Sequence, residues 1–184
     1  MVGKYKLKRD DTVLVVIDLQ EKLMNAMQDR EKVYKNTNLL LSTVKEFNIP
    51  VVLSEQYPRG LGPTVAVIKD NLPADFIYME KQSFSLCGAG LFEILAKLGR
   101  KTVIVCGSET HVCVFQTVRD LVEAGYNVHL VRDAVCSRFD ENYENSLNLM
   151  SELGAVVSNT ETVVFDLLEV SGTKEFKAIS PLIK

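Results

Sequence analysis

Tryptophan is absent from the 184-residue chain, and histidine occurs only as His111 and His129. None of the four cysteines forms a Cys-x-x-Cys pair. A zinc site needs several such ligands at set spacings, so we expect no metal and no other cofactor. The apolar runs are far shorter than the roughly 20 residues that cross a bilayer, and residues 1–10 are too polar for a signal peptide. These absences predict a soluble, cytoplasmic protein with no membrane partner.

A basic patch is missing as well. The 21 Lys and Arg residues are dispersed among 24 Asp and Glu residues, which gives a net charge of −3. Nucleic-acid binding therefore lacks electrostatic support, and we expect no nucleic-acid partner.

In a reducing compartment the four cysteines should be thiols, so a chemical role for one of them is open. They are Cys87, Cys106, Cys113 and Cys136.

Short β-branched runs alternate with longer stretches of helical periodicity. The runs expected as strands are 13–18, 51–53, 76–79, 102–106, 127–131 and 155–157. The stretches expected as helices are 31–47, 88–98, 111–124, 140–153 and 160–169. Residues 54–63 are expected to form a loop, and the tail 171–184 a short helix or an extended arm. Without a linker or repeat, the pattern predicts one three-layer α/β/α domain over residues 1–184, with its core at 11–170. Its doubly wound, Rossmann-like sheet should have about six mostly parallel strands.

Parallel sheets of this kind bind ligands at the carboxyl ends of their strands. Three polar residues are expected there: Asp18 at the end of the first strand, Lys81 just past the third, and Cys113 in the helix after the fourth. Each also has a plainer interpretation. The aspartate could cap a loop, the lysine could be a solvated surface charge, and the cysteine could be a small core residue.

Taken together, the three residues suggest an activated thiol. If Thr110 is an N-cap, Cys113 occupies the third position of its helix, where free N–H groups and the helix dipole would lower the thiol pKa. A nearby lysine would add to this effect, and a carboxylate could carry the proton. The turn 107–110 is either an oxyanion hole or an ordinary strand-to-helix loop. Of the other cysteines, Cys106 should be core and Cys136 should lie in a loop.

Three stretches, in this order, resemble the isochorismatase-like cysteine hydrolases. Residues 15–20 (VVIDLQ) resemble the D-x-Q opening of that family. Glu80-Lys81, followed by Ser83-Phe84, is similar to its lysine motif. Residues 107–114 (GSETHVCV) resemble its G-x-x-T-x-x-C-V signature. The loop 55–64 (EQYPRGLGPT) further resembles a subgroup that is named only for containing this domain.

The resemblance implies a catalytic triad of Asp18, Lys81 and Cys113. It also implies a cis peptide between Ser108 and Glu109, which would aim the Glu109 N–H beside that of Cys113 to hold an oxyanion. It further implies a small-molecule substrate and a homo-oligomer. Apolar residues of the tail could serve that assembly or pack on their own domain: Phe176, Ile179, Leu182 and Ile183. The residues expected to line the substrate pocket are Gln20, Gln56, Tyr57 and Phe84, although Tyr57 and Phe84 could equally belong to the core.

Two differences between this sequence and members of the family narrow the range of reactions that we expect. Nicotinamidases of the family hold a metal through an aspartate and histidines after the second strand, where this chain has no histidine. True isochorismatases lack the nucleophilic cysteine that Cys113 provides. We therefore expect a metal-independent amidohydrolase acting on a small amide or related acyl compound. One alternative is a redox-responsive or binding protein that keeps the fold and a reactive cysteine, and another is a structural subunit.

Overall fold

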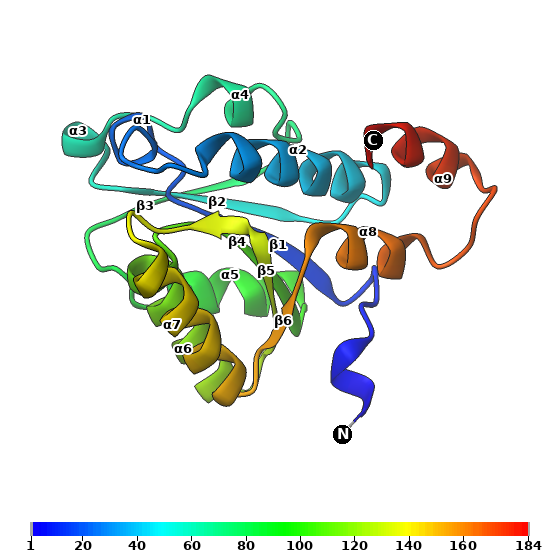
Figure 1. The fold of residues 1–184 in the computed structure, drawn as a ribbon. Coiled ribbons are helices and arrows are strands. Elements are labelled where there is room, and N and C mark those ends of the chain that lie inside the picture. Colours follow the sequence, from blue (N-terminus) through cyan, green and yellow to red (C-terminus); the bar gives the residue numbers. More distant parts are fainter. Residues whose placement is uncertain (1, 184) are drawn as a thin grey trace.

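A computed structural model describes residues 2–183 of the protein (Figure 1). Within these residues a six-stranded, all-parallel sheet has the order β3-β2-β1-β4-β5-β6. The strands are β1 (Thr12–Ile17), β2 (Val51–Gln56), β3 (Ile77–Lys81), β4 (Thr102–Ser108), β5 (Asn127–Cys136) and β6 (Val156–Ser158). This confirms the predicted doubly wound α/β fold.

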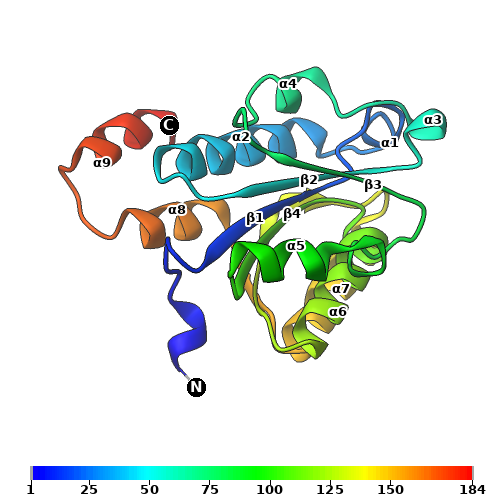
Figure 2. The ribbon, with the colours of Figure 1, turned by 180° about the vertical axis from the view of Figure 1, so that it is seen from behind.

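Helices cover both faces of the sheet (Figures 1 and 2). One face carries α2 (Arg30–Glu46) and α8 (Thr160–Leu168), and the other carries α5 (Leu91–Leu98), α6 (Phe115–Glu123) and α7 (Asp140–Glu152). Shorter helices are α1 (Glu21–Met24), α3 (Pro58–Leu61), α4 (Ala66–Lys69) and α9 (Lys174–Ile179). Single 3₁₀ turns lie at Val2–Tyr5, Cys87–Ala89 and Ser180–Ile183. None of the helices in residues 2–183 has the length and apolarity needed to cross a membrane.

Strand β1 lies in the middle of the sheet and is buried on both faces. Leu14 and Val16 pack into the core cluster beneath α2 and α8, whereas Val13, Val15 and Ile17 pack into the cluster beneath α5, α6 and α7. Successive side chains of a strand point to opposite faces, so a strand covered on both sides must be apolar throughout. The continuous apolar run in the sequence has this physical cause.

Strand β1 has β2 as its neighbour on one side and β4 as its neighbour on the other. Ile17 is in register with Gly107 of β4. Gly107 has φ +124°, and a Cβ on it would lie 2.0 Å from the Ile17 carbonyl oxygen, so a side chain cannot fit there. Just beyond, the Ser108 hydroxyl donates to the Asp18 carbonyl at 2.9 Å. This close approach brings the carboxyl ends of β1 and β4 together at the point where the strand order reverses.

Three expectations for the chain path need correction. Residues 54–63 are not one loop, because β2 continues to Gln56 and Pro58 then begins the short helix α3. Proline suits that first helical position, since its missing N–H has no partner to lose there. Lys81 is the last residue of β3 rather than one beyond it, and Cys136 likewise ends β5.

The tail forms α9 and a 3₁₀ turn, so of the two predicted forms the short helix is confirmed and the extended arm is not. Ile179 is buried in a small cluster with Leu39, Val164 and Leu168, and Phe176 and Ile183 pack against the same cluster. Leu182 is 47% exposed. Three of the four apolar tail residues therefore pack on their own domain.

Candidate active site

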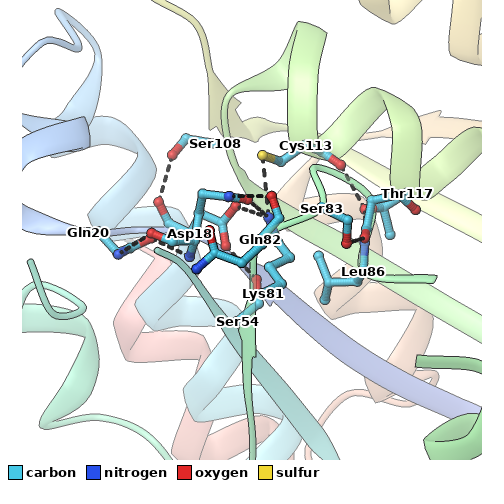
Figure 3. A network of polar contacts seen from close by, with 12 residues as sticks. Asp18, Gln20, Ser54, Lys81, Gln82, Ser83, Leu86, Ser108, Cys113 and Thr117 are labelled. Atoms are coloured by element: carbon cyan, nitrogen blue, oxygen red, sulfur yellow. Dashed lines mark hydrogen bonds and ion pairs between the residues drawn. The ribbon is translucent and has the colours of Figure 1, made fainter. Parts of the chain in front are cut away.

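Asp18, Lys81 and Cys113 converge at the carboxyl edge of the sheet (Figure 3). Lys81 Nζ lies 2.6 Å from Asp18 Oδ2 and 3.4 Å from Cys113 Sγ. The charge of Asp18 also acts on the thiol, because it raises the pKa of Cys113. Asp18 follows β1, Lys81 ends β3 and Cys113 lies in the turn after β4, so the sheet brings together groups that lie far apart in the chain. The plainer interpretation of Lys81 as a solvated charge is wrong, since the residue is 2% exposed.

The carboxylate of Asp18 is held from two sides. Its Oδ2 accepts from Lys81, and its Oδ1 accepts from the Ser54 hydroxyl of β2 at 2.6 Å. Asp18 has φ +49°, which is uncommon for a residue with a side chain, and its backbone N–H donates to the Ser54 carbonyl. Ser54 was not anticipated from the sequence, because its segment was interpreted as a loop. A polar residue in β2 level with the end of β1 was the available signal.

Cys113 does not sit at the third position of an ordinary helix. Residues Thr110–Val114 form a π-helical turn that precedes α6, and Glu109 stands at its N-cap position without a side-chain cap. Thr110 is therefore not the N-cap that was predicted. Its buried hydroxyl has no hydrogen-bond partner among the described residues. Thr117 of α6 donates its hydroxyl to the Cys113 carbonyl at 2.7 Å, which ties the turn to the helix.

The expected lowering of the Cys113 pKa is wrong as well. Burial raises the pKa of the Cys113 thiol to about 12, and the charge of Asp18 also raises it, while Lys81 lowers it. Desolvation acts in this direction because it disfavours the charged form of the thiol. Cys113 is 5% exposed. The sulfur at rest is consequently a protonated thiol beside a carboxylate and an ammonium.

The turn before Cys113 has a cis peptide bond between Ser108 and Glu109. The Glu109 carboxylate points to the end of β5, where its Oε1 accepts from Arg138 Nε at 2.9 Å and from the Arg138 backbone N–H at 3.2 Å. Within the turn, the Glu109 carbonyl accepts from the N–H groups of Val112 and Val114. Sequence reasoning did not single out Arg138, which carried no motif.

The four residues expected to line the pocket fall into two pairs. Gln20 is buried and Gln56 half-buried, and the amides of both bond within the protein. Tyr57 and Phe84 are 49% and 51% exposed, so neither belongs to the core. Tyr57 has φ +39°, and its ring lies over Gly60, where an added Cβ would come within 2.3 Å of the ring.

The three remaining cysteines lie outside this cluster and are buried. Cys106 is fully buried in β4, as expected for a core residue, and Cys87 and Cys136 are buried thiols. Burial raises the pKa of each of these three thiols to about 12. Among residues 2–183 no group of three or more His, Cys, Asp and Glu side chains is placed to hold a metal ion.

The fold and this site define an α/β protein with a doubly wound parallel sheet and a buried Asp–Lys–Cys cluster at the carboxyl edge of that sheet. The Isochorismatase domain family matches residues 12–162. The chain belongs to the isochorismatase family, whose members are in general hydrolases.

Relatives and solved structures agree with this assignment. The chain is 39% identical over 177 residues to the secreted isochorismatase effector Isc1 of Phytophthora sojae, covering 94% of this chain and 84% of the relative. It is 35% identical over 185 residues to isochorismatase domain-containing protein 2 of Danio rerio, covering 100% and 92%. The MAR1 ribonuclease structure from Caenorhabditis elegans superimposes with a TM-score of 0.92 at 34% identity, covering 97% and 92%. An octameric Escherichia coli hydrolase of unknown specificity, YcaC, shares the fold, with a TM-score of 0.89 at 24% identity over 97% and 89% of the chains.

Proposed function

We propose that the protein is a metal-independent cysteine hydrolase that acts on a small amide or related acyl substrate. The observation that carries the proposal is the position of one ammonium, Lys81 Nζ, within hydrogen-bond distance of both the Asp18 carboxylate and the Cys113 sulfur. A core cysteine has no need of a buried ion pair beside it, because burying two charges costs free energy. A nucleophile that must become charged does need one.

The reaction begins with proton transfer. The Asp18 carboxylate takes the Cys113 proton as the sulfur forms a bond to the carbonyl carbon of the substrate, and the backbone N–H groups of Glu109 and Cys113 receive the oxyanion. When the tetrahedral intermediate collapses, the C–N bond breaks and Asp18 returns the proton to the leaving nitrogen. Lys81 stabilises the negative charge, which resides on the carboxylate before the transfer and on the oxyanion after it.

The second half of the reaction releases the acid. A water molecule attacks the thioester carbonyl while Asp18 takes one of its protons. The C–S bond then breaks and the sulfur regains a proton from Asp18, so the site returns to its starting state. Because burial keeps the thiol protonated at rest, the proton has to move during the attack rather than before it.

A redox-responsive role is less well supported. Redox-sensing cysteines are exposed and have a low pKa, because the thiolate is the form that oxidants attack. Cys113 is 5% exposed and burial raises its pKa. The hydrolytic proposal fits a thiol that is ionised by its neighbours only when a substrate arrives.

RNA is not our proposed substrate, although the C. elegans structure is described as a ribonuclease. The present chain has a net charge of −3, and the lysine at its site is already paired with Asp18. A protein that binds polynucleotides depends on unpaired cations along the phosphate backbone. For the same site we propose a small, uncharged acyl compound.

We also propose that the chain forms a homo-oligomer, by analogy with YcaC, whose structure is described as octameric. Large apolar side chains such as Phe165, Val170 and Leu182 are available on the surface to bury in such an assembly. Light scattering behind size-exclusion chromatography measures the mass directly, and a monomer at micromolar concentration would refute this part of the proposal.

Cys113→Ala tests the function, with Cys87→Ala as the matched control. Wild-type protein is screened against a panel of small amides and esters, with a short RNA as a separate arm. Turnover by the Cys113 variant should be at least about a thousandfold lower, and its mass spectrum should show no acyl adduct. Turnover by the Cys87 variant should stay within about twofold of wild type. Unchanged turnover in Cys113→Ala would refute the mechanism, and cleavage of RNA alone would refute the substrate class.

A further inference from the structure

Two glutamines are linked to Lys81 by hydrogen bonds: the Gln20 amide bonds to the backbone of Gln56, and the Gln56 amide bonds to Lys81 Nζ. Gln20 follows β1 and is fully buried. Its Oε1 accepts from the Gln56 backbone N–H at 2.7 Å, and its Nε2 donates to the Gln56 carbonyl at 3.1 Å and to the Gly62 carbonyl at 2.7 Å. The Gln20 amide therefore pairs with both backbone groups of Gln56 and fixes that residue at the end of β2.

The side chain of Gln56 is fixed at both of its ends. Its Nε2 donates to the Gln82 carbonyl at 2.8 Å, and its Oε1 accepts from Lys81 Nζ at 2.7 Å. A carbonyl can only accept, so the Gln82 contact determines which end of the amide is the donor. The oxygen must then face the ammonium, and rotating the amide would cost both bonds.

Lys81 thus has one acceptor for each of its N–H groups. An ammonium carries three N–H donors, and the three partners of Lys81 are Asp18 Oδ2, Gln56 Oε1 and Cys113 Sγ. The stem of a lysine is flexible, and a salt bridge to one carboxylate leaves the ammonium free to turn about its own axis. A second strong acceptor at a fixed position removes that freedom. The remaining N–H is then directed at the weakest acceptor, the sulfur.

We propose that Gln56, held in place by Gln20, is a positioning residue that aims the third N–H of Lys81 at Cys113. Gln56 acts through Lys81 and does not itself bond to the sulfur. The role in catalysis rests on the function proposed above, whereas the effect on the sulfur can be measured without any turnover. This gives Gln20 and Gln56 a role other than contact with the substrate.

The consequence is a change in thiol reactivity. Among the described residues, the charges that act on the Cys113 sulfur are Asp18 at the end of β1, which opposes its ionisation, and Lys81 at the end of β3, which favours it. An ammonium released from Gln56 gives up the favourable contact while the unfavourable carboxylate stays. Below its pKa, a thiol whose pKa rises by one unit has about tenfold less thiolate and is alkylated about tenfold more slowly.

The test measures alkylation of Cys113 by iodoacetamide, followed by peptide mass spectrometry from pH 7 to 9. Gln56→Met keeps the length of the side chain but removes the amide, and Gln56→Asn keeps the amide but withdraws its oxygen. Each should slow alkylation at Cys113 by about fivefold to twentyfold. Gln28→Met, at an exposed glutamine, serves as the matched control and should stay within twofold of wild type.

A double-mutant cycle separates positioning from a general structural effect. The same Gln56 substitutions are made in a Lys81→Met background. If Gln56 acts through the ammonium, they should change the alkylation rate there by less than twofold. Equal slowing in both backgrounds would overturn the proposal, and so would a wild-type rate in Gln56→Met with Lys81 present. Thermal melts of all variants confirm that each measurement is made on folded protein.

This experiment also stands apart from the test of function. If the double-mutant cycle shows no coupling between Gln56 and Lys81 while turnover still depends on Cys113, only the positioning role is refuted. Turnover that survives Cys113→Ala would refute the hydrolase mechanism while leaving the alkylation result to be judged separately.

Discussion

Lys81 Nζ and Asp18 Oδ2 lie 2.6 Å apart with both side chains fully buried, although 63 residues separate them in the chain. A buried pair of this kind is costly to assemble, and it becomes strongly destabilising when one partner is removed.

The ion pair leads to the first prediction. Lys81→Met should lower the free energy of unfolding by about 3–5 kcal/mol, because it leaves the Asp18 charge buried without its partner. Adding Asp18→Asn should recover part of this loss, since no uncompensated charge then remains. Urea denaturation of the single and double variants measures both values. If the double variant were less stable than Lys81→Met alone, the pair would not be the source of the effect.

A second prediction concerns alkaline pH. Burial raises the pKa of the Cys106 thiol from 9.0 to about 12, and the other three cysteines shift in the same direction. Between these values the unfolded thiol loses its proton while the folded one keeps it, so the folded state binds more protons and stability falls as pH rises. Each buried thiol should cost about 1.4 kcal/mol by pH 10.

Cys106→Ala isolates this contribution. The variant should be less stable than wild type at neutral pH, but its stability should fall less steeply than that of wild type between pH 9 and pH 10.5. The comparison of slopes removes the cavity left by the substitution, which does not depend on pH. Parallel curves for the two proteins would contradict the prediction.

A third prediction concerns acid pH. His129 of β5 is 2% exposed, and burial lowers its pKa from 6.5. Its Nε2 is 2.9 Å from the Lys4 carbonyl. Below pH 6.5 the unfolded histidine takes up a proton that the folded one resists, so stability falls as pH falls. His129→Gln keeps a donor for the Lys4 carbonyl. In this variant the free energy of unfolding, measured by urea denaturation, should change less between pH 6.5 and pH 5 than in wild type. A slope as steep as that of wild type would count against it.

A fourth prediction tests the contact between β1 and β4. Gly107→Ala should lower the free energy of unfolding by at least about 3 kcal/mol, because the new Cβ would lie 2.0 Å from the Ile17 carbonyl oxygen at φ +124°. Gly99→Ala is the matched control, because Gly99 also has positive φ but no atom within 4 Å of an added Cβ. It should cost about 1–2 kcal/mol. Similar losses at the two glycines would show that the close contact matters little.

Much of the fold could be predicted because it depends on local pattern. The apolar run through Val13–Ile17 has to be a strand covered on both faces, and the rule for parallel sheets places Asp18 at the ligand-binding edge. The convergence of Lys81 and Cys113 on Asp18 was predicted from motif order. The strand order that produces it cannot be derived from periodicity, which does not say which strands are neighbours.

The features that were missed depend on packing between distant segments. The π-helical turn at Thr110–Val114 lies against α7, and in the helix at Pro58–Leu61 the Gly60 carbonyl accepts from Lys22. Partners of this kind cannot be identified from the local sequence. The direction of the Cys113 pKa was predicted wrongly for the same reason. A helix N-terminus and a lysine are visible in sequence, whereas the depth at which a sulfur lies below the surface is not. Desolvation is the largest cause of the shift, and it is a property of the folded protein alone.

The three members of the site are unequally secured in the sheet. Asp18 and Cys113 follow β1 and β4, which are inner neighbours, whereas Lys81 ends β3, the outermost strand on its side. An outer strand bonds to a single neighbour, so it can detach in a partial opening that leaves the middle of the sheet intact. Such fraying would carry the Lys81 ammonium away from Asp18 and Cys113, at the cost of leaving the Asp18 charge without its partner. Mild heat or denaturant should then reversibly suppress the proposed hydrolase activity, at conditions short of those that unfold the core.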